Sequence, residues 1–173
     1  HNVYTRAAAD LENWIRQGVL VQEPEPAFYP YFQEFAHPET GQVLERRGFI
    51  GLTEAVAYEK KVVHRHERTH SGPKLDRLRL TRHTKAHFGQ LFMLYDDPEF
   101  AVDRQLDEMA ATPPLLEVRD EFGVRHRLWK ITDPSRLGEM QQTMESKKLL
   151  VADGHHRYEA ALRHRDQRSE GGR

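Results

Sequence analysis

The apolar run Leu149–Ala152, followed by Asp153, Gly154 and a segment of helical periodicity, constrains the fold more than any other feature of the chain. A short apolar run that ends at a turn residue predicts a buried strand, and residues Gly154–Arg168 are predicted to form a helix. Glycine at the junction lets the backbone approach a ligand closely. The N–H groups and positive dipole end of the following helix favour an anion. The sequence therefore predicts a phosphate pocket where this strand ends.

Three side chains at the start of the predicted helix add hydrogen-bond donors to this pocket. His155 and His156 are followed by Arg157, whose guanidinium can grip two phosphate oxygens at once. Asp153 is suited to holding Mg²⁺ between phosphates. The alternative is an Asp helix cap followed by solvated polar residues. Cationic side chains are unfavourable beside the positive end of a helix, which argues for a bound anion. We assign Gly154, His155, His156 and Arg157 to cofactor binding and Asp153 to catalysis and metal binding.

A basic segment runs from Lys60 to His87. It contains nine Lys or Arg residues against the two acids Glu67 and Asp76, whereas the whole chain has 26 basic and 27 acidic residues. Five of the eleven histidines also lie there. The simpler interpretation is a solvated face balanced by the acidic segment 96–108. We favour anion binding because isolated acids and histidines interrupt the basic run. From this segment, the residues expected in the cofactor site are His66, Thr69, Lys74 and Arg77.

The segment His66–His70 also spells the H-E-x-x-H pattern of zinc hydrolases, in which Glu67 would activate a zinc-bound water. That site requires both histidines on one helical face. The Ser71–Pro73 turn follows at once, and the charged Arg68 stands where a helix behind a metal needs an apolar residue. A zinc metallohydrolase is therefore a remote alternative. As a loop, the segment is either a polar surface or a single carboxylate among cations, which suits a general base beside a polyphosphate.

The remaining patterns predict an α+β protein, with one compact domain over residues 1–168 and a flexible tail over residues 169–173. The chain begins at His1, and we expect it to be a fragment of a longer protein. Helices are expected at Thr5–Gln17, around Leu75 and Leu78, after Asp96 through Val102, Leu106 and Met109, at Pro134–Met144 and at Gly154–Arg168. Strands are expected at Ala27–Phe35, Gln42–Leu52, Tyr58–Val63, Leu91–Tyr95, Leu115–Val118, Arg125–Ile131 and Leu149–Ala152, with hairpin turns at His37–Gly41 and Asp120–Gly123.

Several function classes are disfavoured by composition. No run of about 18 apolar residues occurs, so no membrane span is expected. The chain has no cysteine, which excludes disulfides, thiolate nucleophiles and cysteine-bound zinc. We find no helix-turn-helix pattern, and DNA binding is not expected. A cytoplasmic location is the expectation from these features.

Motifs spread over almost the whole chain are shared with a known family. They are Trp14–Leu20, Arg47–Gly51, Tyr58 with His66–Thr69, Lys74 with Asp76 and Arg77, Gly123–His126 with Leu128 and Trp129, and Ala152–Tyr158. On these residues, the region Tyr4–Leu162 resembles an uncharacterised prokaryotic family catalogued as a domain of unknown function, number 1015. This resemblance implies a shared fold and leaves the activity open.

A narrower resemblance carries more chemistry. His66 with Glu67, and the segment Asp153–Arg157, resemble two motifs of the free serine kinases of the ParB/sulfiredoxin-like superfamily. The resemblance implies a mixed sheet with flanking helices, here with inserted β-hairpins. It also implies that Glu67 deprotonates a hydroxyl, that Asp153 assists or binds magnesium, and that Gly154–Arg157 hold phosphates. In this chain 85 residues separate Glu67 from Asp153, more than in the kinases, so serine itself is not implied.

Two functions remain open. The first is an enzyme that transfers a phosphoryl group from a nucleotide, ATP or ADP, to a small hydroxylated metabolite with the help of Mg²⁺. The second is a nucleotide-binding sensor with little turnover. Glu67 separates them, because a sensor needs the phosphate site and has no use for a carboxylate aimed at an acceptor hydroxyl.

Overall fold

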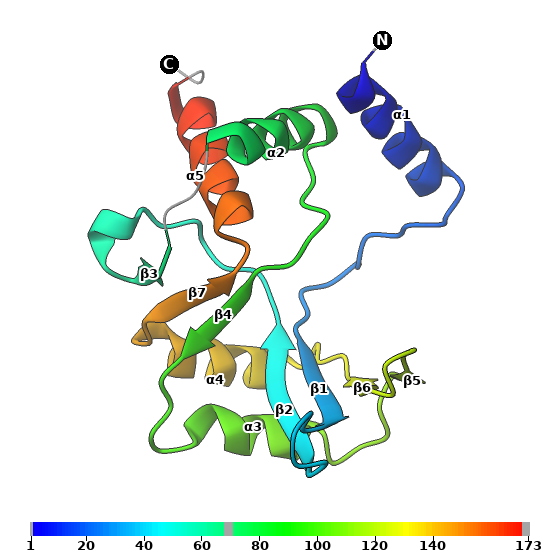
Figure 1. The fold of residues 1–173 in the computed structure, drawn as a ribbon, viewed down its shortest axis with the longest axis vertical. Coiled ribbons are helices and arrows are strands. Elements are labelled where there is room, and N and C mark those ends of the chain that lie inside the picture. The colour runs from blue at the N-terminus through cyan, green and yellow to red at the C-terminus, as the bar shows by residue number, and fades with distance from the viewer. Residues whose placement is uncertain (1, 68–70, 171–173) are drawn as a thin grey trace. The chain divides into compact units, whose positions relative to one another are not determined.

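The computed structural model describes residues 2–67 and 71–170. Its contacts group into two compact units. Unit 1 consists of His1–Gln22, Glu54–Asp96 and Lys147–Arg173, and unit 2 of Glu23–Thr53 and Asp97–Ser146. The sequence predicts one domain, and that these two units belong to a single domain stays a prediction. Figure 1 shows the elements of both.

Unit 1 is built on a three-stranded mixed sheet of order β3-β7-β4. The central strand β7 runs parallel to β3 and antiparallel to β4, and the helices α1, α2 and α5 complete the unit, with α2 packed on both α1 and α5 (Figure 1). The elements are α1 (Val3–Arg16), the 3-10 turn η1 (Tyr58–Lys60), β3 (Val63–Arg65), α2 (Ser71–Thr84), β4 (Phe92–Tyr95), β7 (Leu149–Asp153) and α5 (His155–Glu170).

The core of unit 1 anchors α5 on the sheet. Val63 of β3 and Val151 of β7 are fully buried against Tyr158 of α5. The Tyr158 hydroxyl donates to the carbonyl of Val56 at 2.7 Å and accepts from the Val56 N–H at 3.0 Å. Burial of each such side chain contributes about 1.5–3 kcal/mol. Because Tyr158 lies one turn into α5, this packing fixes where the N-terminus of the helix meets the end of β7.

Unit 2 contains a separate four-stranded antiparallel sheet of order β2-β1-β6-β5 with two helices. Both predicted hairpins are confirmed, and their turns contain glycines with positive φ, 68° at Gly41 and 80° at Gly123. The elements are β1 (Tyr29–Ala36), β2 (Val43–Ile50), α3 (Ala101–Met109), β5 (Leu116–Arg119), β6 (Arg125–Leu128) and α4 (Pro134–Glu145). The buried core residues are Phe28, Phe32, Val102, Leu106, Met109, Trp129 and Met140.

The α+β class is confirmed, with five helices and two sheets in the described chain. The two hairpins pair with each other in a sheet of their own. The predicted strand Tyr58–Val63 is wrong over most of its length. A 3-10 turn occupies its start and ends at Lys61, whose φ of 56° is left-handed, so pairing begins only at Val63. Helix α5 continues to Glu170, and residues 171–173 of the predicted tail lie outside the described part. No described helix is both long and apolar enough to cross a membrane.

Candidate functional site

Parallel pairing of β3 and β7 brings the two sequence motifs to the same end of the sheet. Val63 pairs with Leu149 and Arg65 with Val151. The carboxyl ends of parallel strands lie at one edge, where ligands bind in open sheets. Glu67 follows β3 by two residues, and α5 follows β7 after one. The separation of these motifs by 85 residues in the sequence is therefore removed by the topology.

Gly154 makes the turn from β7 into α5. Its φ is +98°, a backbone conformation that other residues adopt only with strain. A Cβ atom here would lie 2.7 Å from Cδ2 of Leu91 and 2.9 Å from a terminal nitrogen of Arg157, so there is also no space for a side chain. The first helical hydrogen bond runs from the Tyr158 N–H to the Gly154 carbonyl at 2.9 Å. The N–H groups of the three preceding residues have no partner within the helix.

Glu67 contacts the first residue of α5 directly. Its Oε1 lies 3.0 Å from Nδ1 of His155. The His155 side chain is 2% exposed and the Glu67 side chain 51% exposed. A buried imidazole therefore holds one oxygen of a carboxylate that is open to solvent. The structure thus joins the two motifs through a contact that the sequence does not reveal.

His66 completes this cluster. Its ring packs edge-on against that of His155, with 4.6 Å between the ring centroids. Nδ1 of His66 lies 2.9 Å from the carbonyl oxygen of Val151, and this bond requires a proton on Nδ1, which leaves the lone pair on Nε2 of the neutral ring. His66 is therefore fixed in orientation by β7, although its own side chain is exposed.

The cluster has the donors for a cation. One ligand atom each from His66, Glu67 and His155 lies within 4.8 Å of the others. The bond from His66 to a backbone carbonyl is of the kind that commonly orients metal-binding histidines. The zinc pattern proposed from the sequence is different, because His66 and Glu67 lie in a bend and α2 begins only at Ser71. Arg68, Thr69 and His70 lie outside the described residues, and so does their assignment to a site.

Asp153, the last residue of β7, forms an ion pair with Arg157 on the first turn of α5. Oδ2 of Asp153 lies 2.8 Å from a terminal nitrogen of Arg157, and the Asp153 side chain is 75% exposed. Exposed pairs of this kind contribute about 0–1 kcal/mol and are easily exchanged for a ligand. The guanidinium also lies near Gly89 and Gly154, where added Cβ atoms would come within 3.4 and 2.9 Å of its nitrogens. Both residues therefore remain accessible to phosphate and Mg²⁺.

Lys74 pairs with an acid of α5, a contact that the sequence does not indicate. Its Nζ is 2.6 Å from Oε2 of Glu159, and the guanidinium of Arg65 is 3.5 Å from the other oxygen of the same carboxylate. Arg65 also stacks over the ring of Tyr58 at 4.9 Å. Burial raises the pKa of Tyr58 to about 12. These contacts connect α2, β3 and α5, so Lys74 braces the helices that carry the site. The partner Glu159 was missed because nothing in its local sequence marks it.

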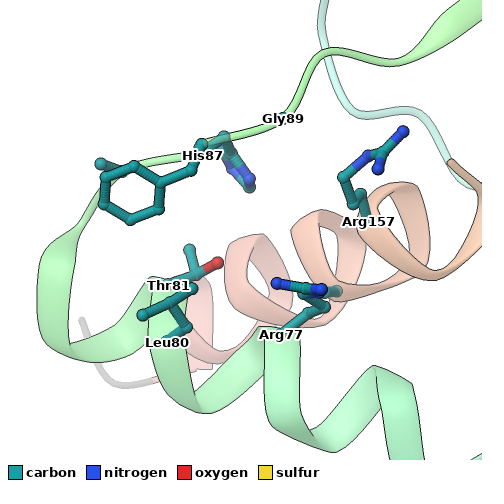
Figure 2. A pocket seen from close by; sticks show the side chains of 9 residues that line it. Arg77, Leu80, Thr81, His87, Gly89 and Arg157 are labelled. Atoms are coloured by element: carbon teal, nitrogen blue, oxygen red, sulfur yellow. The ribbon is translucent and has the colours of Figure 1, made fainter. Parts of the chain in front are cut away.

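Arg77 and Arg157 line a hollow of about 250 Å³ between α2, α5 and the segment 86–89 (Figure 2). Sequence reasoning had proposed both arginines and missed the other side chains. The signal available was spacing, since Arg77 and Thr81 are four residues apart on one helix and share a face. The lining residues are Arg77, Leu80, Thr81, Ala86, His87, Phe88, Gly89, Arg157 and Ala160.

Comparison with known proteins places the chain in one family. The family model described as "Protein of unknown function (DUF1015)" matches residues 1–173, and the chain belongs to this family. No curated protein and no solved structure matches the chain.

Proposed function

We propose that this protein transfers a phosphoryl group from a nucleotide, ATP or ADP, to the hydroxyl of a small metabolite, in the manner of the free serine kinases. The observation that carries the proposal is the 3.0 Å contact between Glu67 Oε1 and His155 Nδ1. It brings Glu67, the candidate base, to the N-terminus of α5, where phosphate would bind.

The nucleotide phosphates are held by α5 in this proposal. Gly154 allows the phosphates to approach the backbone, and the N–H groups of His155, His156 and Arg157 are available to them. Arg157 exchanges its exposed pairing with Asp153 for phosphate oxygens. Magnesium held by Asp153 would neutralise charge on the phosphates. These groups position the nucleotide and stabilise the charge of the transition state, which is most of what phosphoryl transfer requires.

Glu67 acts as the general base. His155 binds one carboxylate oxygen, which leaves the other for the acceptor hydroxyl. The hydroxyl gives its proton to Glu67 as its oxygen bonds to the terminal phosphorus, and the bond from that phosphorus to the nucleotide oxygen breaks. Because Glu67 is half exposed, the acceptor can reach it from solvent.

A ParB/sulfiredoxin-like fold for unit 1 is supported by the parallel pairing of β3 and β7. One of the two motifs of the proposed site follows each of these strands. In this proposal the antiparallel sheet of unit 2 is the insertion that lengthens the chain between Glu67 and Asp153.

A nucleotide sensor is the second candidate. The observation in its favour is that Glu67 already has a partner in His155, and that contact can hold the loop in place without chemistry. The donors of α5 would then bind a nucleotide without turnover.

Two substitutions separate these candidates. Glu67→Gln keeps size and most hydrogen bonding, so an enzyme retains ADP affinity and loses transfer rate by about 10²–10⁴-fold. Arg157→Ala weakens ADP binding by about 1.5–3 kcal/mol in both candidates. Calorimetry with ADP and Mg²⁺, together with transfer from ATP to a panel of hydroxylated metabolites beginning with serine, gives both quantities.

Matched controls remove the same charges elsewhere in unit 1. Glu59→Gln changes an exposed acid of η1, and Arg163→Ala changes an exposed arginine of α5. Neither control should alter rate or affinity. Wild-type protein that binds ADP, phosphorylates none of the acceptors and is unchanged by Glu67→Gln would exclude the enzyme and leave the sensor.

A further inference from the structure

The hollow between α2 and α5 has a lining suited to negative charge. Every side chain there that hydrogen-bonds can donate, namely Arg77, Thr81, His87 and Arg157. The lining residues include no carboxylate and no side-chain amide. The others are apolar or glycine. Two arginines therefore line this hollow, and the acid paired with Arg157, Asp153, is not among the lining residues. Guanidiniums are suited to binding oxyanions.

Thr81 gives independent support for a ligand. The residue is 6% exposed, yet its hydroxyl has no partner among the described residues. Figure 2 shows the oxygen directed into the hollow, on the side where Arg77 also lies. A hydroxyl that faces a hollow and has no protein partner is free to bond an occupant of the hollow. Arg77 likewise has no acidic partner in the described part of the chain.

The volume limits what can bind. Pockets for whole small-molecule ligands measure about 300–1,000 Å³. The hollow, at about 250 Å³, falls just below that range and has room for a single group with its immediate neighbours. A complete nucleotide would have to extend beyond it.

We propose that this hollow binds the oxyanion group of a small molecule, a phosphate or a carboxylate, through Arg77, Thr81 and Arg157. This proposal depends only on the residues that line the hollow and does not require that the protein transfers phosphoryl groups. Under the proposed function, its occupant is either a phosphate of the nucleotide or the acidic group of the acceptor, which would make the acceptor an anionic metabolite.

Titration with inorganic phosphate at constant ionic strength, followed by NMR of the arginine side chains, tests this site. Binding in the millimolar range is expected. Arg77→Gln should weaken it by about 10–100-fold and the isosteric Thr81→Val by about 5–10-fold, since each removes a hydrogen bond to a charged group. Arg79→Gln removes the same charge from an exposed position of α2 outside the hollow and should change affinity less than about twofold.

Absence of phosphate binding, equal losses in Arg77→Gln and Arg79→Gln, or an unchanged affinity in Thr81→Val would each overturn the site. Selective losses in Arg77→Gln and Thr81→Val support it, even if no transfer activity is found. Displacement of phosphate by ADP then assigns the hollow to the nucleotide, and simultaneous binding of both assigns it to the acceptor.

Discussion

Unit 2 pairs its charged side chains with one another, and unit 1 leaves several polar groups unpaired beside a helix terminus. On the sheet of unit 2, Arg47 bonds both Glu45 and Asp107, at 2.7 and 2.6 Å. Arg125 bonds Glu117 at 2.9 Å. Charges satisfied in this way stabilise a surface and have little left for a ligand. We therefore regard unit 2 as a scaffold.

In unit 1, three consecutive residues each carry a buried nitrogen without a partner in the described chain. These atoms are Nε2 of His155, Nε2 of His156 and Nε of Arg157. Unit 2 has two such atoms, in Gln105 and Arg127, and these lie far apart in sequence. Because proteins rarely leave buried polar groups unpaired, a run of them at one helix start indicates a binding site. Whether polar groups are paired, more than how much charge they carry, therefore distinguishes the candidate site from the scaffold.

The largest expected effect is the loss of stability when alanine replaces Gly154 of unit 1, compared with alanine at Gly123 of unit 2. Gly154 and Gly123 both have positive φ, but a Cβ atom at Gly123 meets nothing within 4 Å. Gly123→Ala should therefore cost only the strain, about 1–2 kcal/mol. Gly154→Ala adds overpacking against Leu91, for a total of about 2–5 kcal/mol. Urea denaturation measures both losses, and equal values would mean that the close packing around Gly154 is not present.

Removal of the Tyr58 hydroxyl should have a smaller effect. This hydroxyl is buried without a partner in the described chain, so Tyr58→Phe should change the free energy of unfolding by less than about 1 kcal/mol at neutral pH.

The same variant should alter the response to alkali. Burial raises the pKa of Tyr58 to about 12, above the usual value near 10. The stability linked to its protonation is complete below about pH 10 and lost as the pH rises through 12. Wild-type protein should lose stability relative to Tyr58→Phe over that window. Parallel curves for the two proteins would show that Tyr58 is solvated.

The smallest expected effect concerns zinc. Because His66 and Glu67 lie in a bend before α2 and not on a helix face, the purified protein should contain almost no zinc. Elemental analysis checks this. About one zinc per chain, lost in His155→Ala and kept in His83→Ala, would instead identify His66, Glu67 and His155 as a metal centre.

The sequence was most informative where local chemistry decides structure. The apolar run before Gly154 predicted both β7 and α5, and the turn glycines predicted both hairpins. It was least informative about pairing between distant segments. Nothing local indicates that β3 pairs with β7, that His155 contacts Glu67, or that the hairpins form their own sheet, because each depends on contacts between residues far apart in sequence. For the same reason Thr81 and Glu159 were missed, since their roles arise only when α2 packs on α5.

Hydrogen–deuterium exchange with and without ADP and Mg²⁺ tests the division into site and scaffold most directly. Slower exchange is expected at the amides of His155–Tyr158 and in the segment 86–89, with no change in the strands of unit 2. A nucleotide that at saturation protects only unit 2, or leaves the start of α5 unchanged, would contradict it.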